Sequence, residues 1–479
     1  MFWGETMKNK INNIIKFIYL IITLLISLNF IRVVNNLNIL PNKYLILFIS
    51  IIILLNILNI ILTLIKRIWT KIISIIIGLL LISISIIGTI YINDTKDFLD
   101  SSFNNNIKEI TTYNYIVLNN DKYNSLEDLS NKKIGYFVSE KDKEEIINNI
   151  DNYNLTKKEY LDLYELYKDL SSKKIDVILI DSAYLDILSE DNKNLYEDIK
   201  IINEFNIETI LSNKEEIIAE LKPINIYISG SDSRSKTIYN KSRSDVNMIL
   251  TINPNSKDIL ITSIPRDYYV QVHNQIGLKD KLTHAGIYGL DISEKTIEDL
   301  FNIEIDYSIK INFNAVTEVV DLVGGVDIYS DITFNSYHKK GWVVKKGWNH
   351  MDGTKALAYS RERYAYASGD RHRIKNQQQV LEAVLKKVMT NKKLLLQYDE
   401  LLSSLSNLYR TTIPKEVITL FVKEQLNDMA TWNFDSYRVN GSNASLPTYT
   451  APKSKRYVMI PYEEDIEKAH NKIVSVLNK

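Results

Sequence analysis

Three long apolar runs open the chain, ahead of a region in which short apolar stretches alternate with polar ones. The runs cover Ile11–Ile31, Tyr44–Ile65 and Ile72–Ile92. Each is near the ~20 residues that a helix needs to cross the hydrocarbon core of a bilayer. A cleaved signal peptide is not expected, because there are three runs and no small-residue cleavage site follows the first. The pattern predicts three transmembrane helices within residues 1–93.

The charges beside these runs predict an orientation. Cations gather at the start of the first run, at Lys8, Lys10 and Lys16, and between the second and third runs, at Lys66, Arg67 and Lys71. After the third run the acids Asp94, Asp97 and Asp100 outnumber Lys96. Because basic residues favour the cytoplasmic side, we expect a multi-pass cell-membrane protein with a cytoplasmic N-terminus. Everything after about Asn93 would lie outside the cell.

A small α/β domain is predicted for residues 113–215, after a polar, Asn-rich stretch (94–112) that we expect to be a linker. Short apolar strands alternate there with amphipathic helices, which favours a sheet of parallel strands. The segments Ser125–Gly135 and Lys173–Asp181 resemble one lobe of a periplasmic solute-binding domain. Residues 113–213 contain no arginine and no histidine. We therefore expect a binding or spacing role for this accessory domain, not catalysis.

A second α/β domain is predicted for residues 222–395, with 396–479 as its C-terminal extension. Strands are expected where β-branched and apolar residues gather, at Ile224–Ser229, Val246–Ile252, Asp258–Ile264 and Ile305–Phe313. Helices are expected at Ser293–Leu300, Ala315–Leu322, Gly353–Ser360 and Glu463–Leu477, and an exposed loop at Pro447–Ser454. Folds of this class place their ligands in loops at strand ends.

Composition removes several classes of function. Lys+Arg and Asp+Glu balance at 58 each, so no basic field indicates nucleic acid. The chain has no cysteine, which excludes disulfides, thiol catalysis and cysteine-ligated zinc and suits an exported bacterial protein. Its histidines match no compact zinc-ligand spacing. Serine-hydrolase and P-loop motifs are also missing from the sequence.

The stretch Tyr359–Val384 concentrates arginine. Four of the chain's 12 arginines lie within it, whereas lysine, with 46 residues, is the usual cation elsewhere. Arginine presents a rigid fork that grips phosphate or carboxylate with two bonds. A helical pattern follows, on which Arg373 and Gln377 share a face. The stretch predicts a site for a multiply charged anion; a solvated charged loop is the alternative that the stretch alone leaves open.

Acids and bases also follow the strands of this domain. Gly230–Arg234 follows the first strand and contains Asp232, and Arg243-Ser244-Asp245 precedes the second. Two carboxylates from neighbouring strand ends could hold one Mg²⁺, which prefers oxygen ligands and phosphate partners. Asp-capped turns with surface ion pairs are the alternative. Pro265 fixes the backbone before Arg266 at the end of the third strand and so orients that arginine; an ordinary turn with an exposed arginine is the alternative. Lys281 adds a cation in the next loop, where a solvated surface lysine is the alternative.

In their order these motifs closely resemble the LytR-CpsA-Psr family over about residues 224–395. The matching segments are G-S-D-S-R, R-S-D-V-N-M-I-L-T-I-N-P, I-P-R-D-Y-Y-V, K-L-T-H-A, L-V-G-G-V-D-I, A-L-A-Y-S-R-E-R and G-D-R-H-R-I-K-N-Q-Q-Q-V. The resemblance implies an α/β fold with a mixed sheet between helices and an apolar pocket for a lipid chain. It also implies transfer of a glycopolymer from a polyprenyl-pyrophosphate carrier to peptidoglycan through a phosphodiester link. The partners would be that lipid-linked glycan, peptidoglycan and the membrane, and no nucleic acid.

The same resemblance implies roles for single residues. Asp232, Asp245, Arg361 and Arg363 would be catalytic, and Asp232 and Asp245 would ligate Mg²⁺, with Mn²⁺ as an alternative. The pyrophosphate and head group would be bound by Arg243, Arg266, Lys281, Arg361, Arg363, Arg373 and Gln377. The two aspartates are also the candidates for a general base. The chain departs from the common family pattern at Tyr288 and Asn376.

Two rival functions use the same residues. With water as acceptor, the site would be a polyprenyl-pyrophosphate phosphatase, and sequence does not separate hydrolysis from transfer. A membrane-anchored sensor or binding protein led by residues 113–213 is the non-enzymatic alternative. The sequence does not name the polymer, whether teichoic acid, capsule or another. A DNA-binding regulator is disfavoured, because the site is expected outside the cell and no basic helix-turn-helix is visible.

Overall fold

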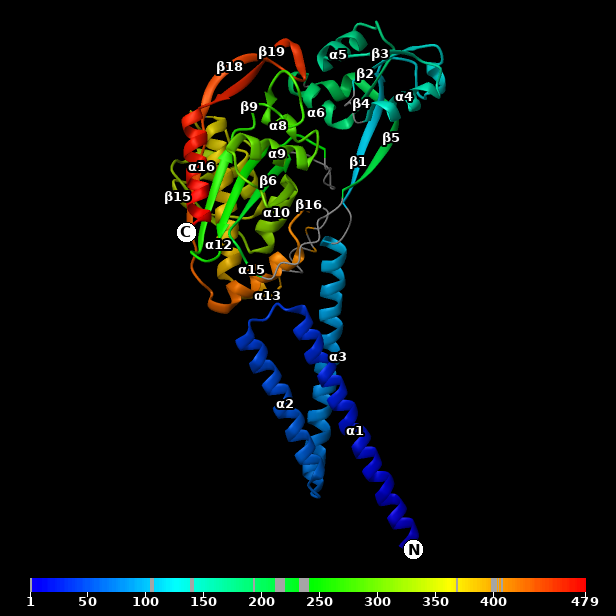
Figure 1. The fold of residues 1–479 in the computed structure, drawn as a ribbon, viewed down its shortest axis with the longest axis vertical. Coiled ribbons are helices and arrows are strands. Elements are labelled where there is room, and N and C mark those ends of the chain that lie inside the picture. The colour runs from blue at the N-terminus through cyan, green and yellow to red at the C-terminus, as the bar shows by residue number, and fades with distance from the viewer. Residues whose placement is uncertain are drawn as a thin grey trace.

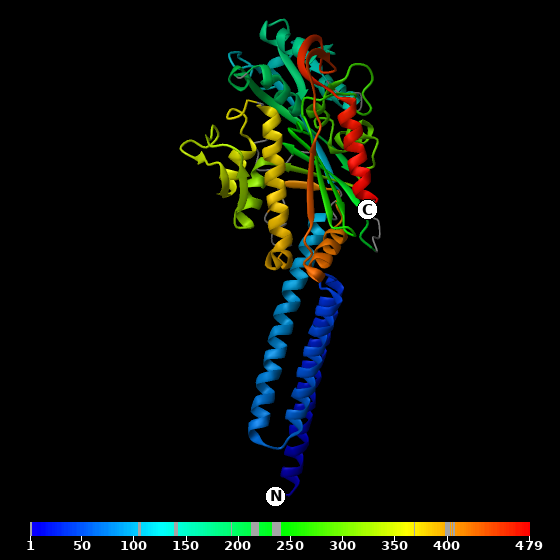
Figure 2. The ribbon, with the colours of Figure 1, turned by 90° about the vertical axis from the view of Figure 1, so that its left-hand side faces the viewer.

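Three long apolar helices carry two α/β domains (Figure 1). The computed structural model describes residues 2–103, 107–137, 142–192, 194–211, 220–231, 241–367, 369–397, 403, 405 and 408–479. The helices α1 (Phe2–Leu37), α2 (Asn42–Leu64) and α3 (Ile68–Phe103) contain the three predicted runs. Each is long and apolar enough to cross a membrane. The N-terminus and the α2–α3 turn lie at one end of this bundle, and both domains lie at the other (Figures 1 and 2).

Polar side chains are buried between the three helices. The Tyr19 hydroxyl donates to the Ser74 carbonyl at 2.8 Å, and the Ser74 hydroxyl donates to Asn59 Oδ1 at 2.6 Å. Apolar surface gives helices no net drive to associate inside lipid, so such hydrogen bonds and close packing hold them together. This network explains how three nearly uniform apolar helices find one arrangement.

The accessory domain is a five-stranded sheet in the order β3-β2-β4-β1-β5. Its strands are β1 (Ile107–Leu118), β2 (Lys133–Phe137), β3 (Thr156–Glu159), β4 (Val177–Asp181) and β5 (Ile199–Leu211). Its helices are α4 (Lys143–Asp151), α5 (Leu163–Ser171), α6 (Ser182–Asp191) and α7 (Leu195–Asp198), with a 3-10 turn, η1 (Glu127–Leu129). The predicted parallel pairing holds for β2 with β3 and β4.

Two expectations for this region were wrong. Strand β1 runs antiparallel to both β4 and β5, so the sheet is mixed. In place of a linker at residues 94–112, α3 continues to Phe103 and β1 begins at Ile107. The reason is the long β1–β5 pairing, which extends from Leu118 with Ile199 to Ile107 with Leu211. It supplies backbone hydrogen bonds to a polar segment that has few apolar residues to bury.

The second domain is built on a six-stranded sheet in the order β16-β11-β6-β7-β8-β17. Its strands are β6 (Ile224–Ser231), β7 (Val246–Asn253), β8 (Asp258–Ile264), β11 (Tyr307–Asn312), β16 (Tyr409–Thr411) and β17 (Asn433–Arg438). Strands β11 and β6 are parallel, as are β8 and β17, and the other pairs are antiparallel. The expected mixed sheet is therefore confirmed.

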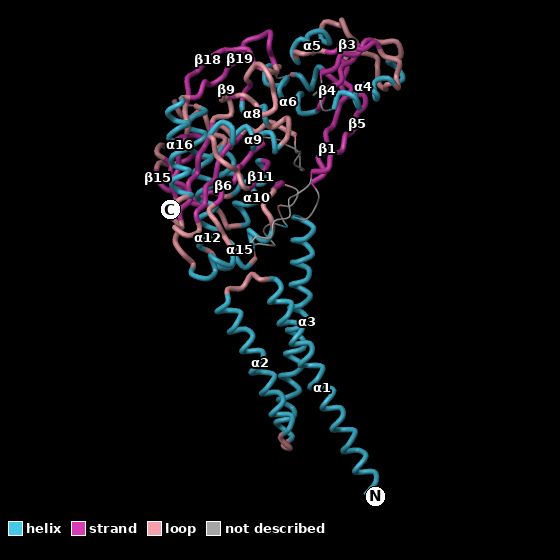
Figure 3. The backbone as a smooth tube through the Cα atoms, in the orientation of Figure 1, coloured by secondary structure: helices cyan, strands magenta, loops and turns pink. Residues whose placement is uncertain are grey.

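Helices cover both faces of this sheet, as the sequence predicted (Figure 3). One face packs Tyr227 and Leu260 against α9 (Leu290–Phe301) and α16 (Glu463–Leu477). The other packs Met248 and Leu250 against α12 (Asp370–Thr390) and α15 (Lys415–Asp428). Shorter helices complete the layers: α8 (Leu282–Ala285), α10 (Phe313–Leu322), α11 (Gly353–Ser360) and α13 (Lys392–Leu396).

Small two-stranded sheets extend from the domain. They pair β9 (Tyr269–Val270) with β10 (Asp280–Lys281), β12 (Val326–Ser330) with β15 (Gly347–Met351), β13 (Phe334–Asn335) with β14 (Val343–Val344), and β18 (Gly441–Thr448) with β19 (Ala451–Pro461). The loop predicted at Pro447–Ser454 was wrong. That segment is the tip of the β18–β19 hairpin, in which Thr448, Thr450 and Ala451 are buried.

The tip of this hairpin joins the two domains. The Lys453 N–H donates to Asp162 Oδ2 at 3.2 Å. The Arg456 guanidinium carbon lies 3.6 Å from the centroid of the Tyr164 ring. Ile287, from the loop after α8, is buried in the core of the accessory domain. The second domain and the accessory domain therefore share a packed contact.

The loop between α1 and α2 contacts the second domain directly. Ile39 is buried with Leu395, Val422 and Leu426. The Lys423 ammonium donates to Asn38 Oδ1 at 2.8 Å. The helix α15 is thus seated on the end of the apolar bundle.

Candidate functional site

A chain of ion pairs joins the loops at one end of the six-stranded sheet. Arg266 Nη1 donates to Asp245 Oδ1 at 2.8 Å, and Arg243 Nη2 lies 3.9 Å from Asp245 Oδ2. Asp267 pairs with both Arg266 Nε, at 3.7 Å, and Lys281 Nζ, at 3.5 Å. Four of the predicted site residues, Arg243, Asp245, Arg266 and Lys281, therefore lie together.

Backbone hydrogen bonds fix the loops that carry these side chains. The Ser244 N–H donates to the Thr283 carbonyl at 3.0 Å, and the Thr283 N–H donates to the Arg266 carbonyl at 2.8 Å. The Asp245 N–H donates to the Gly230 carbonyl at 2.7 Å. The loops before β7, after β8 and after β10 are thus tied to one another and to the end of β6.

The Asp245 carboxylate is buried and ionised. Burial alone would raise its pKa, but the guanidinium groups of Arg243 and Arg266, and that of Arg373 on α12, outweigh burial and hold the pKa below its usual range. Opposite charges within reach favour the charged form. Arg373, on helix α12, therefore stabilises the charge of the same carboxylate.

A fully buried lysine supports the loop before β7 from beneath. Lys310 on β11 has no exposed surface, and its Nζ donates to the Ser242 carbonyl at 3.3 Å. A buried cation is costly unless hydrogen-bonded or paired. Lys310 therefore helps fix the loop that carries Arg243 and Asp245. Lys310 was not predicted as a site residue, because in the sequence it is a single lysine in an otherwise ordinary strand.

The turn after α11 presents Arg361 and Arg363 around a buried acid. Glu362 is fully buried and accepts the N–H groups of Tyr337 at 2.8 Å, Tyr364 at 3.0 Å and Ala365 at 3.4 Å. The Arg361 guanidinium carbon lies 5.5 Å from the Phe313 ring centroid. Glu362 was not predicted as a site residue; its only signal was an acid placed between two arginines.

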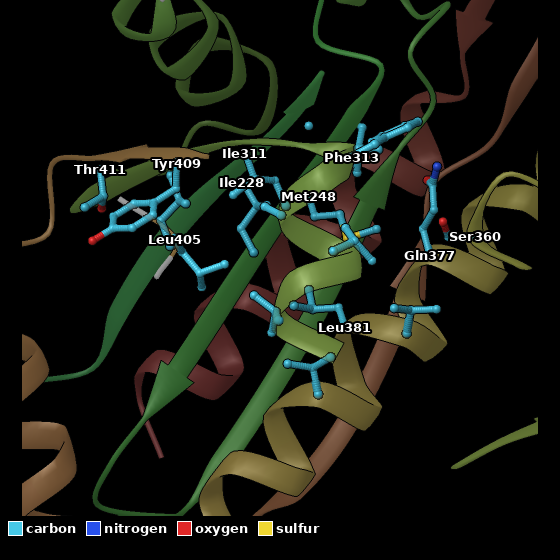
Figure 4. Close-up of a pocket in the computed structure, with 18 of the residues that line it drawn as sticks. Ile228, Met248, Ile311, Phe313, Ser360, Gln377, Leu381, Leu405, Tyr409 and Thr411 are labelled. Carbon is cyan, nitrogen blue, oxygen red and sulfur yellow. The ribbon is translucent and has the colours of Figure 1, made fainter. Parts of the chain in front are cut away.

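An apolar cavity of about 270 Å³ lies between the sheet and helices α10 and α12. Phe313, Ser360 and Gln377 lie at one end of it, and Leu405, Tyr409 and Thr411 at the other (Figure 4). The walls between are aliphatic and include Ile228, Met248, Ile309, Ile311, Val316, Val319, Val380, Leu381 and Val384. The sequence alone did not locate this cavity.

The ion-pair chain and the arginine turn meet at one end of the cavity. Gly230 lines the cavity and binds the Asp245 N–H. Phe313 lines it and lies beside Arg361. Gln377, one helical turn after Arg373 on α12, lines the same end. One end of the apolar cavity therefore lies beside a group of cationic side chains. We refer to this group, Arg243, Arg266, Arg361, Arg363 and Arg373, as the cationic mouth.

Some predicted residues are placed elsewhere or are not described. Arg371, one of the four clustered arginines, donates to the Gly441 carbonyl at 3.1 Å and so binds the β18–β19 hairpin. Asn376 donates to the Tyr359 carbonyl at 3.0 Å and ties α12 to α11. Tyr288 is partly buried and packs against the cores of both domains. Asp232 lies outside the described residues.

Of the two aspartates predicted to ligate a metal, only Asp245 lies within the described residues. No group of three or more acidic or histidine side chains within the described part of the chain forms a ready metal site. Asp245 supplies an ionised oxygen ligand of the type Mg²⁺ prefers, with Oδ2 only loosely paired at 3.9 Å. The Asp245 carboxylate is therefore compatible with a cation, and metal binding stays a prediction.

Comparison with known proteins gives a consistent relationship. A model described as the LytR_cpsA_psr family matches residues 182–466, more than half of the chain. The polyisoprenyl-teichoic acid–peptidoglycan teichoic acid transferase TagU of Bacillus anthracis is 33% identical over 237 residues, covering 49% of this chain and 73% of that protein. The enzyme of the same name from Enterococcus faecalis is 30% identical over 222 residues, covering 46% and 72%.

Solved structures resemble about half of the chain. The crystal structure of B. subtilis TagV is 28% identical and aligns over 54% of this chain and 98% of its own, with a TM-score of 0.46. The structure of TagT bound to LIIa-WTA is 23% identical and aligns over 55% and 94%, with a TM-score of 0.45.

Proposed function

The chain belongs to the LytR_cpsA_psr family, and from that premise we propose that it is a glycopolymer–peptidoglycan phosphotransferase. Its donor would be a glycopolymer, of the teichoic acid type named for its relatives, on a polyprenyl-pyrophosphate carrier. The product would be a phosphodiester between the polymer and peptidoglycan. The observation that carries the proposal is an apolar cavity, one end of which lies beside Arg361 and beside the ion pair of Arg266 with Asp245.

The cavity suits the lipid part of the donor. Its walls come from aliphatic side chains of β6, β7, β11, α10 and α12. Ile418 of α15 also lines it, and this residue packs against the cluster that contains Ile39 of the α1–α2 loop. The apolar channel thus adjoins the end of the membrane helices, where a polyprenyl chain would leave the bilayer.

The cationic mouth suits the pyrophosphate. Arg243, Arg266, Arg361, Arg363 and Arg373 would neutralise its charges with charge-assisted hydrogen bonds. Catalysis of phosphoryl transfer rests mainly on positioning and charge stabilisation, not on covalent participation by the protein. Asp245 fixes Arg266 and Arg243 in place and so preorganises the mouth before the substrate arrives.

The reaction breaks the pyrophosphate bridge. A hydroxyl oxygen of peptidoglycan would bond to the phosphorus that carries the glycan, and polyprenyl phosphate would leave. The hydroxyl proton passes to solvent or to the leaving phosphate, whose second pKa is near ~6. Asp245 is a poor general base, because its arginine partners lower the pKa of its carboxyl. This disfavours one of the two bases considered from sequence.

A divalent cation belongs to the proposal. Asp245, with Asp232, would hold Mg²⁺ or Mn²⁺, which would supply further positive charge beside the phosphate oxygens. Direct measurement of Mn²⁺ binding by electron paramagnetic resonance tests this apart from activity. Loss of the bound-Mn²⁺ signal in Asp245→Asn would support the assignment, and an unchanged signal would refute it.

The membrane topology is also part of the proposal. The α1–α2 loop touches the catalytic domain, whereas the N-terminus and the α2–α3 turn, with Lys66 and Arg67, lie at the far end of the bundle (Figure 2). That arrangement agrees with a cytoplasmic N-terminus and an extracellular catalytic domain. Protease treatment of intact cells should cut after residue 93; full protection would contradict the orientation.

Transfer is tested with the full chain in lipid nanodiscs. The assay contains a polyprenyl-pyrophosphate oligosaccharide, a peptidoglycan acceptor and Mg²⁺. We expect a glycan–peptidoglycan phosphodiester from the wild type and none from Arg361→Ala/Arg363→Ala, with an unchanged melting temperature. Release of glycan phosphate without attachment would establish a phosphatase instead. Full transfer by the double variant would refute the assigned site.

A further inference from the structure

Two exposed tyrosine rings stand beside the arginine turn. Tyr337 and Tyr364 are 64% and 57% exposed, and their ring centroids lie 4.3 Å apart at an interplanar angle of 47°. The His338 ring lies 5.3 Å from that of Tyr337 and 6.4 Å from that of Tyr364. We refer to Tyr337, His338 and Tyr364 as the aromatic platform. Adjacent large rings left open to solvent commonly mark a binding surface.

The platform is anchored to the arginine turn, which carries Arg361 and Arg363. One buried carboxylate, that of Glu362, accepts the backbone N–H groups of both Tyr337 and Tyr364. Arg363 donates from Nη2 to the Tyr364 hydroxyl at 2.7 Å and lies 4.8 Å from the centre of that ring. The rings are therefore held in a defined place relative to Arg363 before any ligand binds.

The platform also continues the order of the site. The apolar cavity ends at Phe313, Arg361 lies beside Phe313, and the platform lies against Arg363, two residues after Arg361. A lipid-linked glycan carries its parts in the same order: apolar chain, pyrophosphate, saccharide. The chemical group that would reach these rings is thus a sugar.

We propose that the aromatic platform binds a pyranose ring of a saccharide substrate; the inference rests on the proposed function. The C–H groups on one face of a pyranose are weakly positive and pack on the negative face of a tyrosine ring. The tyrosine hydroxyls and Arg363 offer hydrogen bonds to the sugar hydroxyls at the rim. The sugar comes either from the donor, next to its pyrophosphate, or from the acceptor glycan strand.

Binding is measured by saturation-transfer NMR and titration calorimetry on the full chain in nanodiscs. The probes are a polyprenyl-pyrophosphate disaccharide, the same polyprenyl pyrophosphate without sugar, and a soluble peptidoglycan glycan fragment. The variant is Tyr337→Ala/Tyr364→Ala. Trp348→Ala is the matched control, since Trp348 is 74% exposed and contacts the ring of Tyr329, not the platform. Tyr337→Phe/Tyr364→Phe keeps both rings.

We expect the alanine pair to weaken at least one saccharide probe about tenfold, as loss of two ring contacts implies, and to leave the sugar-free pyrophosphate unchanged. Loss confined to the disaccharide lipid assigns the platform to the donor, and loss confined to the glycan fragment assigns it to the acceptor. Trp348→Ala should bind like the wild type, and Tyr337→Phe/Tyr364→Phe, which keeps both rings but loses the hydroxyls, should weaken the saccharide probes less than the alanine pair does.

Two results would overturn the proposal. The first is unchanged binding of both saccharide probes by the alanine pair. The second is equal weakening of the sugar-free pyrophosphate, because the rings would then act only by supporting the arginines. Failure of the wild type to transfer glycan, with saccharide binding intact, would refute the proposed function and leave the sugar site standing.

Discussion

Arg266 and Asp245 form a close ion pair at the cationic mouth, with Nη1 2.8 Å from Oδ1. The carboxylate is buried and the guanidinium is only partly so. The acid therefore keeps the Arg266 guanidinium in place while the outer part of that guanidinium stays accessible. Removing a charge from such a pair is costlier than removing a surface ion pair, because the remaining charge has lost its solvent as well as its partner.

Replacement of Asp245 by Asn is expected to destabilise the protein by about 2 kcal/mol at pH 7. The folded pKa of Asp245 is lowered, so its ionised form contributes stability above the unfolded pKa of ~3.9, and this contribution is lost as pH falls through the folded pKa. The difference between wild type and Asp245→Asn should therefore shrink toward pH 3. Thermal unfolding of the nanodisc-bound protein at several pH values measures it.

A control for this experiment is Asp435→Asn. Asp435 pairs with Lys472 at 2.7 Å on an exposed strand, and exposed pairs contribute about 0–1 kcal/mol. A loss of stability by Asp245→Asn that did not change with pH would show that packing, not charge, is responsible.

Val384→Phe is expected to fill part of the cavity. Val384 lies on α12 and lines the apolar walls, so a larger ring would occupy space needed by a lipid chain. We expect KM for a long-chain polyprenyl donor to rise at least tenfold, with little change for a donor of one or two isoprene units.

Val388→Phe serves as the comparison, since Val388 is one turn further along α12 and packs in the clusters beside the cavity. Overpacking there would cost about 1–3 kcal/mol of stability without selecting between donors. An equal effect of Val384→Phe on both donor lengths would argue against a lipid in the cavity.

Lys310→Met is expected to loosen the loop before β7. The substitution keeps the length of the side chain but removes the donor to the Ser242 carbonyl, and an unsatisfied buried carbonyl costs about 1–3 kcal/mol. Hydrogen exchange should rise at residues 241–245 more than in the rest of the sheet. Lys355→Met, which removes an exposed ion pair with Asp352, should change exchange only locally. Uniform faster exchange in Lys310→Met would indicate a general loss of stability instead.

Glu294→Gln is expected to stabilise the protein at neutral pH. Burial raises the pKa of Glu294, although the Ser308 hydroxyl donates to its carboxylate and opposes that rise. An acid whose pKa is raised in the folded state contributes most to the free energy of unfolding below its unfolded pKa. That contribution is lost as pH rises through the folded pKa. The melting temperature of Glu294→Gln should match the wild type near pH 4 and exceed it at pH 7. A lower value at both pH values would contradict this assignment.

Elements with apolar patterns were predictable from the sequence. The bounds of Asp258–Ile264, Gly353–Ser360 and Glu463–Leu477 agree with β8, α11 and α16, because each has a buried face that sets its hydrophobic period. Strand β3, Thr156–Glu159, has four exposed residues and no apolar signal. Its place in the sheet comes from backbone pairing with β2, which the side chains do not encode.

The site was predictable in its charges and not in its shape. Arginines and acids at strand ends indicated a site for an anion, and the structure brings Arg243, Asp245, Arg266 and Lys281 together. The cavity leaves no periodic signal, because each lining residue alone looks like core. The platform joins Tyr337 and Tyr364 through the buried Glu362, a contact between separate segments that no local pattern contains.

The helix α15 has a consequence for where the enzyme can work. Its Ile418 lines the cavity, and its Lys423 binds the loop between the first two apolar helices. With the helices in the membrane as proposed, this contact would hold the cationic mouth at one height above the bilayer. Under the proposed function, an acceptor strand would have to come within reach of that height, so attachment would be confined to peptidoglycan close to the membrane.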